Sequence, residues 1–136
     1  MTVKDRYENV QSLFGMAHAS ACLFLCMLSI AEENNGGKPI DFISAYQLAI
    51  VNNCMEANFY IKDQEKLLLL LTGHKWHKSI ATKLPDPVPN NVNTVERWVD
   101  AKGNTHFRRR GFDTLSNGVG TNGKKFDCYY IYTMEV

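Results

Sequence analysis

The chain has 136 residues, of which 45% are apolar, and its 15 basic side chains nearly balance its 14 acidic ones. This length suits one core, so we predict a single domain over residues 1–136. The balanced charge argues against long nucleic acid or a membrane as the partner. The four cysteines show neither a CxxC pattern nor zinc-type spacing, which favours a reducing, cytoplasmic setting.

An apolar stretch over residues 17–31 dominates the first part of the chain. It is too short for a membrane span and polar residues interrupt it, so we predict a helix over Met16–Glu33 that is buried on all sides. The Asn-Asn-Gly-Gly sequence at 34–37 suits the left-handed backbone that ends a helix. Cys22 and Cys26 lie within this helix and are predicted to pack as small apolar side chains.

Two shorter helices are predicted after this one. Asp41 is a suitable N-cap for a helix that continues to about Asn52, with apolar residues at helical spacing. Asp63 is a suitable N-cap for a helix over residues 66–71. Between the two helices, residues 59–61 are predicted to be extended.

The pattern changes to that of a sheet after residue 73. Four strands are predicted, at residues 75–82 (an edge strand), 95–99, 105–112 and 126–134. A turn at 101–104 joins the strands at 95–99 and 105–112 into a hairpin. The proline-rich segment at 84–89 is predicted to be a loop, because proline has no backbone N–H to donate to a neighbouring strand. The chain is therefore predicted to be an α+β domain, with a helical half at 1–73 and a sheet half at 74–136.

Three segments of the chain carry a resemblance to a known family. Gln11 precedes Met16 by five positions and leads into the long helix; the middle segment runs from Ala45-Tyr-Gln to Trp76; and the last runs from Trp98 to Lys124. Their order and spacing resemble the papain-like cysteine peptidases, in the compact form of the bacteriocin-processing peptidases, including versions from spirochaetes and bacterial viruses. The resemblance covers most of the chain. It implies a helical lobe with a buried central helix, packed on a C-terminal antiparallel sheet.

The resemblance also shows where the catalytic positions are degenerate. In the family, a glutamine helps to stabilise the oxyanion and a cysteine at the helix start forms the thiolate, but Met16 cannot be deprotonated. Residues 96–98, Glu-Arg-Trp, stand where a histidine is expected. His106 precedes Asp113 by seven residues, so on one regular strand the two would face opposite sides unless Gly111 supplies a bulge. The degenerate catalytic positions are Gln11, Met16, His106 and Asp113.

The densest positive cluster lies around Arg108-Arg-Arg110, near Lys124 and Lys125. On a strand, Arg108 and Arg110 would share one face and Arg109 would take the other. Guanidinium groups pair bidentately with phosphate or carboxylate, so a small anionic ligand such as a nucleotide could bind here. The alternative is a solvated strand face with local acidic partners.

These patterns lead to one leading hypothesis and two alternatives. The leading one is a papain-like domain that has lost peptidase chemistry and binds a peptide, a protein or a small anionic ligand in the cleft between its lobes, for example as an accessory protein of a bacterial virus. The residues predicted to bind the ligand are Gln11, Met16, His18, His106, Arg108, Arg110 and Lys124.

The first alternative is an anion-binding protein, with a nucleotide as the ligand, that uses the strand containing Arg108 and Arg110. The second is an active thiol peptidase whose nucleophile is displaced to Cys22 or Cys54, acting with His106. No cofactor is predicted, and no metal either, because His74 and His77 have no third ligand at suitable spacing.

Overall fold

The structure is a computed structural model that describes residues 2–3, 21–109 and 121–136. Several predictions concern residues beyond these ranges and stay predictions. They include the first turns of the long helix and the candidate residues Gln11, Met16, His18, Arg110 and Asp113.

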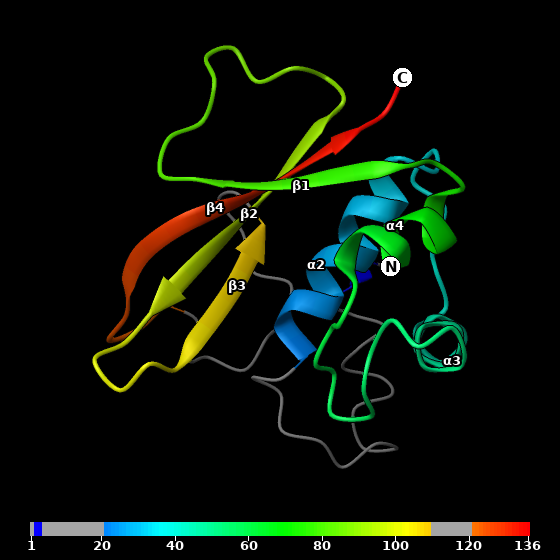
Figure 1. Cartoon of the computed structure of the whole chain (residues 1–136), viewed down its shortest axis with the longest axis horizontal. Coiled ribbons are helices and arrows are strands. Elements are labelled where there is room, and N and C mark those ends of the chain that lie inside the picture. Colours follow the sequence, from blue (N-terminus) through cyan, green and yellow to red (C-terminus); the bar gives the residue numbers. More distant parts are fainter. Residues whose placement is uncertain (1, 4–20, 110–120) are drawn as a thin grey trace.

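In the described ranges, three helices precede four strands (Figure 1): α2 (Cys22–Glu33), α3 (Phe42–Val51), α4 (Gln64–Thr72), β1 (Trp76–Ala81), β2 (Val92–Val99), β3 (Thr105–Arg109) and β4 (Lys125–Met134). The strands form one antiparallel sheet in the order β1-β4-β2-β3, which leaves β1 and β3 at its edges. The predicted α+β class is confirmed, and so is the position of β1 at an edge.

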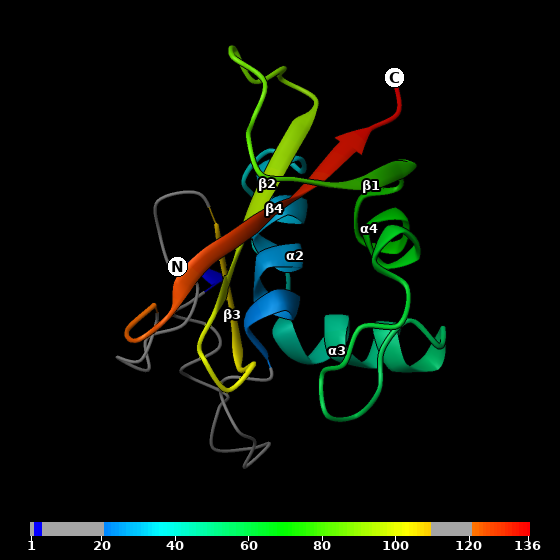
Figure 2. The same cartoon turned by 60° about the vertical axis from the view of Figure 1, so that its left-hand side comes forward.

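Helix α2 is the central element of the fold. Nine of its 12 residues are buried, and Figure 2 shows the helix between the sheet on one side and α3 and α4 on the other. The chain leaves α2 through Gly36 and Gly37, whose φ angles of 64° and 77° are left-handed, as predicted. Because α2 has apolar side chains around its whole circumference, it is stable only where the sheet covers one face and other helices cover the opposite face, so that water is excluded from both.

The core joins this helix to both of its neighbours. Phe24 lies in an aromatic cluster, with ring centroids 5.6 Å from Phe42 and 5.7 Å from Phe59. Leu67 and Leu68 of α4 are fully buried in the same core. Burying side chains of this size contributes about 1.5–3 kcal/mol each, so the two shorter helices are stabilised mainly by packing.

Both predicted N-caps are confirmed, but one neighbouring prediction is wrong. Asp41 and Asp63 accept hydrogen bonds from the backbone N–H groups of Ser44 and Lys66, and α4 therefore begins at Gln64, two residues before its predicted start. Residues 59–61 are not a strand. Only Ile61 forms an isolated bridge, while Phe59 has a left-handed φ of 72° and turns the chain back into the core.

We expect Asp41→Ala to lower the free energy of unfolding by about 1 kcal/mol, because α3 loses its N-cap. The Asp41 carboxylate accepts from both the N–H and the Oγ of Ser44, each at 2.8 Å. Asp41→Asn is the matched control, since asparagine caps almost as well. Urea denaturation of both variants measures the difference, and equal losses for the two would contradict a capping role.

The register of the sheet decides which side chains face the helices. Directly paired residues of antiparallel strands share a face, and Arg97 is paired with Phe107 whereas Trp98 is paired with His106. The side with Arg97 and Phe107 is the helix-facing side, because Arg109, two residues beyond Phe107, reaches Ser29 of α2. The opposite side, with Trp98 and His106, is called the outer side below.

Candidate functional site

A cleft of about 930 Å³ lies between the start of α2, the loop at residues 58–61 and the helix-facing side of the sheet. Lys78 pairs with Tyr132 near the end of β4, whereas Lys124 immediately precedes the start of that strand. The two lysines therefore mark opposite ends of the cleft, and side chains from all four strands line or border the space between them.

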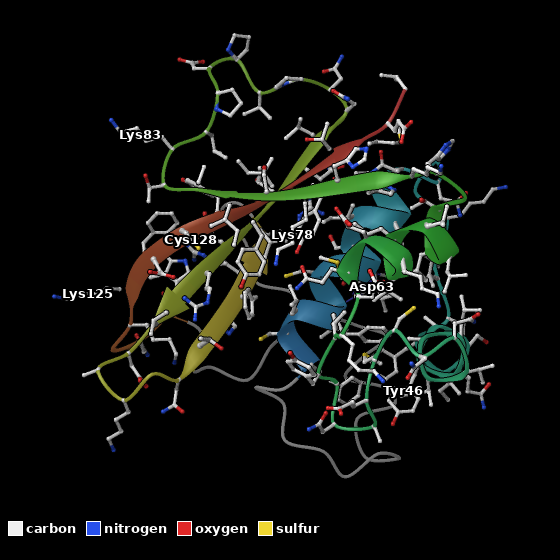
Figure 3. The ribbon with its side chains drawn as sticks, viewed as in Figure 1. Tyr46, Asp63, Lys78, Lys83, Lys125 and Cys128 are labelled. Carbon is white, nitrogen blue, oxygen red and sulfur yellow. The ribbon has the colours of Figure 1, made fainter. Side chains whose placement is uncertain are left out.

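Lys78 is the cation held most closely in the cleft. Figure 3 shows it pointing from β1 toward the space between the sheet and α2, and its Nζ lies 4.0 Å from the ring centroid of Tyr130. Burial lowers the pKa of Lys78, although the nearby Cys128 and Glu65 act in the opposite direction. In the described part of the chain it forms no ion pair. Its ammonium group is thus short of solvation and available to an anion.

Two further cations line the cleft beyond Lys78. Arg97 forms an ion pair with Asp127, which lies at the bulge between β2 and β4. Lys124 makes no ion pair within the described ranges. Asp100 also lines the cleft, but its carboxylate accepts from the backbone N–H groups of Lys102 and Asn104 at 2.9 Å each. With Arg97 paired to Asp127, the two ammonium groups of Lys78 and Lys124 face the single carboxylate of Asp100, so the cleft keeps an excess of positive charge.

Aromatic rings form much of the apolar surface between these charges. Phe107 and Tyr130 lie with centroids 5.3 Å apart and an interplanar angle of 46°. Tyr60 lines the opposite wall and is 63% exposed. Ring faces next to ammonium groups favour ligands that combine a planar part with an anionic part.

Phe59 contributes an unusual feature to the wall of the cleft. Its φ of 72° is rare for a bulky side chain and is strained. The side chain is nevertheless buried, with ring centroids 5.7 Å from Phe24 and 5.2 Å from Tyr46. Packing therefore holds the 58–61 loop in a conformation that the backbone alone disfavours, and such strain is concentrated at binding sites.

The outer side of the sheet holds two of the predicted ligand residues. Arg108 Nε donates to Glu96 Oε1 at 2.6 Å, and the guanidinium carbon lies 5.0 Å from the ring of Trp98. Trp98 Nε1 donates to the same oxygen at 2.9 Å. His106 is opposite Trp98 and is buried. His106 and Arg108 thus lie on the face of the sheet away from the cleft, whereas Lys124, also predicted, lines the cleft.

Arg109 has a structural role that the sequence prediction did not assign. It is buried on the helix-facing side, where its guanidinium donates to Ser29 Oγ at 2.9 Å and to Glu33 Oε2 at 3.1 Å. Its Nε donates to the carbonyl oxygen of Thr94 at 3.2 Å. The prediction that Arg108 and Arg109 face opposite sides is confirmed. The signal for this ion pair was available in the four-residue spacing of Ser29 and Glu33, which puts both on one face of α2.

All four cysteines are free and buried. The predicted packing of Cys22 and Cys26 is confirmed, since they are 2% and 0% exposed. Cys22 borders the cleft without presenting its side chain to solvent. Burial raises the pKa of Cys54 and of Cys128. This shift disfavours the thiolate and is opposite to that of activated cysteines.

Sequence reasoning missed most of the cleft. Lys78, Arg97, Phe107 and Tyr130 come from four different strands, and each by itself is an ordinary strand residue. A weak signal was present in Lys78 and Arg97, because a charged residue inside a strand that covers a helix needs a partner or a cavity.

The described residues contain no group of three or more histidine, cysteine, aspartate or glutamate side chains placed to hold a metal ion. Likewise, none of the helices described is long and apolar enough to cross a membrane. Comparison of the chain with protein-family models, with curated proteins and with solved structures found no match. The case for function therefore depends on the residues of the chain itself.

Proposed function

We propose that this chain is a binding protein with a papain-like arrangement of a helical lobe and a sheet lobe, and that it does not hydrolyse peptides. The arrangement is supported by the resemblance of the sequence segments and by the buried central helix packed on an antiparallel sheet. The observation that carries the proposal is the cleft beside the start of α2, with cations and aromatic rings but no exposed thiol among its described residues. Its volume of about 930 Å³ lies within the range of small-ligand sites, about 300–1,000 Å³.

The ligand in this proposal carries negative charge. Arg97 is already paired with Asp127, but the ammonium groups of Lys78 and Lys124 still outnumber the carboxylate of Asp100 in the cleft. A neutral or cationic ligand would leave the half-buried ammonium of Lys78 without a counter-charge. The strand with Arg108 is a less favoured anion site, because that guanidinium already pairs with Glu96.

The active thiol peptidase is the less favoured alternative. Cys22 and Cys54 are the displaced nucleophiles it needs, and both are buried. Cys54 Sγ donates to the carbonyl oxygen of Asn52 at 3.7 Å, and burial raises its pKa. A nucleophilic cysteine needs the reverse, an accessible thiol whose pKa is lowered by a nearby cation or helix N-terminus.

We expect the purified protein to show no hydrolysis of fluorogenic peptides or esters that iodoacetamide can block. We also expect the native cysteines to react with iodoacetamide far more slowly than in urea, because all four are buried. The raised pKa values of Cys54 and Cys128 mean that less thiolate is present at any given pH, so their alkylation should accelerate only above the pH at which a free cysteine reacts. Mass spectrometry after timed alkylation measures each site.

Two results would contradict this part of the proposal. Turnover that iodoacetamide abolishes would establish thiol chemistry. One cysteine that is alkylated in the native protein as fast as a free thiol at neutral pH would identify a candidate nucleophile. Cys26, fully buried in α2, serves as the internal reference for an inert thiol.

A further inference from the structure

We propose that the cleft binds a nucleoside phosphate, with the phosphate at Lys78 and the base against the rings of Phe107 and Tyr130. This inference rests on the proposed binding function and narrows its ligand. The arrangement is local: the Lys78 ammonium is 4.0 Å from the Tyr130 ring centroid, and that ring is 5.3 Å from the Phe107 ring. A ligand that joins an anion to a planar ring can contact all three side chains at once.

The phosphate position follows from the surroundings of Lys78. The Tyr130 ring lies beside its ammonium, and the side chains of Glu65 and Cys128 are close enough to influence its pKa. The Glu65 carboxylate accepts the backbone N–H of Lys78 itself at 2.8 Å, so this acid is already engaged with the strand. A phosphate would give the ammonium a charge-assisted partner without displacing an existing ion pair.

The base position follows from the rings. Phe107 and Tyr130 sit on adjacent parts of the helix-facing side, because β2 separates their strands and Arg97 and Val95 are their respective partners in it. Stacking a base on such rings contributes about 1–3 kcal/mol and tolerates any base. The exposed ring of Tyr60 lies in the same cleft and can cover the other face of the base.

Lys124 fits this ligand as a secondary contact. It lies at the other end of the cleft from Lys78, next to the turn that holds Asp100. An acidic peptide could also pair with Lys78 and Lys124. It would make no contact with the Phe107 and Tyr130 rings unless it had an aromatic residue between its acidic residues. The rings therefore favour the nucleoside phosphate over the peptide.

The test measures binding of adenosine, guanosine, cytidine and uridine monophosphates to the full chain by thermal shift and calorimetry. Inorganic phosphate, adenosine and a poly-glutamate peptide are the reference probes. A ligand that binds only the native state raises the melting temperature. We expect the monophosphates to bind at least about tenfold more tightly than inorganic phosphate or adenosine, because each reference probe lacks one of the two contacts.

The variants separate the two subsites. Lys78→Gln should weaken monophosphate binding by about tenfold or more, whereas Lys83→Gln, on the distal loop in Figure 3, should leave it unchanged. Tyr130→Leu should weaken binding of the monophosphates but not of inorganic phosphate. Tyr130→Phe keeps the ring and should bind the monophosphates as the parent chain does. Lys124→Gln should have a smaller effect of about threefold, with Lys125→Gln as its matched control outside the cleft.

Surface variants keep the test decisive if a buried variant fails to fold. Tyr60 is 63% exposed and Lys124 precedes β4, so Tyr60→Ala and Lys124→Gln should both fold and still weaken binding of the monophosphates. The inference is overturned if no monophosphate binds at millimolar concentration, or if binding is indifferent to Lys78→Gln, Tyr60→Ala and Lys124→Gln alike. If inorganic phosphate or poly-glutamate binds as tightly as the monophosphates and depends on Lys78, the nucleoside inference fails while the proposed anion-binding function stands.

Discussion

Replacing Phe59 by alanine should lower the free energy of unfolding by about 3–5 kcal/mol. The Phe59 ring lies 5.7 Å from Phe24, 6.0 Å from Phe42 and 5.2 Å from Tyr46, between centroids. Truncation removes the side chain that all three share and leaves a cavity among them. The packing that holds Phe59 at its left-handed φ of 72° is lost with it, so the 58–61 loop should also become less ordered. Urea denaturation followed by tryptophan fluorescence measures the loss of stability.

The neighbouring residue provides a matched control for this prediction. Tyr60 is 63% exposed, so Tyr60→Ala should change the free energy of unfolding by no more than about 0.5 kcal/mol. Phe59→Leu keeps much of the buried volume and should lose less than Phe59→Ala. If Phe59→Ala and Tyr60→Ala destabilised the protein equally, packing of the Phe59 ring against its aromatic neighbours would not be what holds the 58–61 loop in place.

Glu96→Ala should cost about 3 kcal/mol of stability, at the lower end of what breaking a buried ion pair costs. The Glu96 side chain is only 9% exposed and one of its oxygens accepts from both Arg108 and Trp98. Alanine would leave a guanidinium that is 24% exposed and an indole N–H without their acceptor. The loss of stability is limited by the partial exposure of Arg108, because water can solvate part of its unpaired guanidinium charge.

A conservative change and a double variant separate charge from packing. Glu96→Gln keeps an oxygen for the Trp98 indole and should cost about 1–2 kcal/mol. Adding Arg108→Met to Glu96→Ala should recover part of the loss, since the double variant buries no unpaired charge. Thermal and urea denaturation of the set give the coupling energy. Strictly additive losses would show that the two side chains do not act as a pair.

The local features of the fold could be predicted from the sequence because they depend on neighbouring residues. Asp41 and Asp63 stand directly before apolar helical patterns, and each is an N-cap in the structure. The hairpin between β2 and β3 was predictable from its Lys-Gly-Asn sequence, and in the structure Gly103 has a left-handed φ of 85°. In each case the residues that determine the conformation lie within one turn of chain.

The cleft could not be predicted, because its geometry depends on the register of strands far apart in the chain. Lys78 and Tyr130 meet only because β1 pairs with β4, and Phe107 joins them only because β2 lies between β3 and β4. A shift of one residue in any pairing would send these side chains to the outer side. The sequence favoured Arg108 by its visible charge, yet that residue faces the outer side and pairs with Glu96.

The prediction for residues 59–61 failed for a related reason. Phe-Tyr-Ile is an apolar, aromatic triplet of the kind that strands prefer, but none of the four described strands pairs with it. Glu56 and Tyr60 close a tight turn instead, with Glu56 N–H donating to the carbonyl oxygen of Tyr60 at 2.9 Å. The stabilisation gained by burying the Phe59 ring in the core thus outweighs the local preference for an extended chain.

The contact between Glu65 and the backbone of Lys78 also affects how copies of the chain behave at high concentration. An edge strand such as β1 is a template on which another chain can extend the sheet, and Ile80 on this strand is 60% exposed. The Glu65 carboxylate occupies one of the backbone donors that such an addition would need. Glu65→Ala would unblock that donor, so fibril or oligomer formation should begin at lower protein concentration than in the parent chain. Glu65, in the first turn of α4, is therefore expected to oppose self-association through this edge.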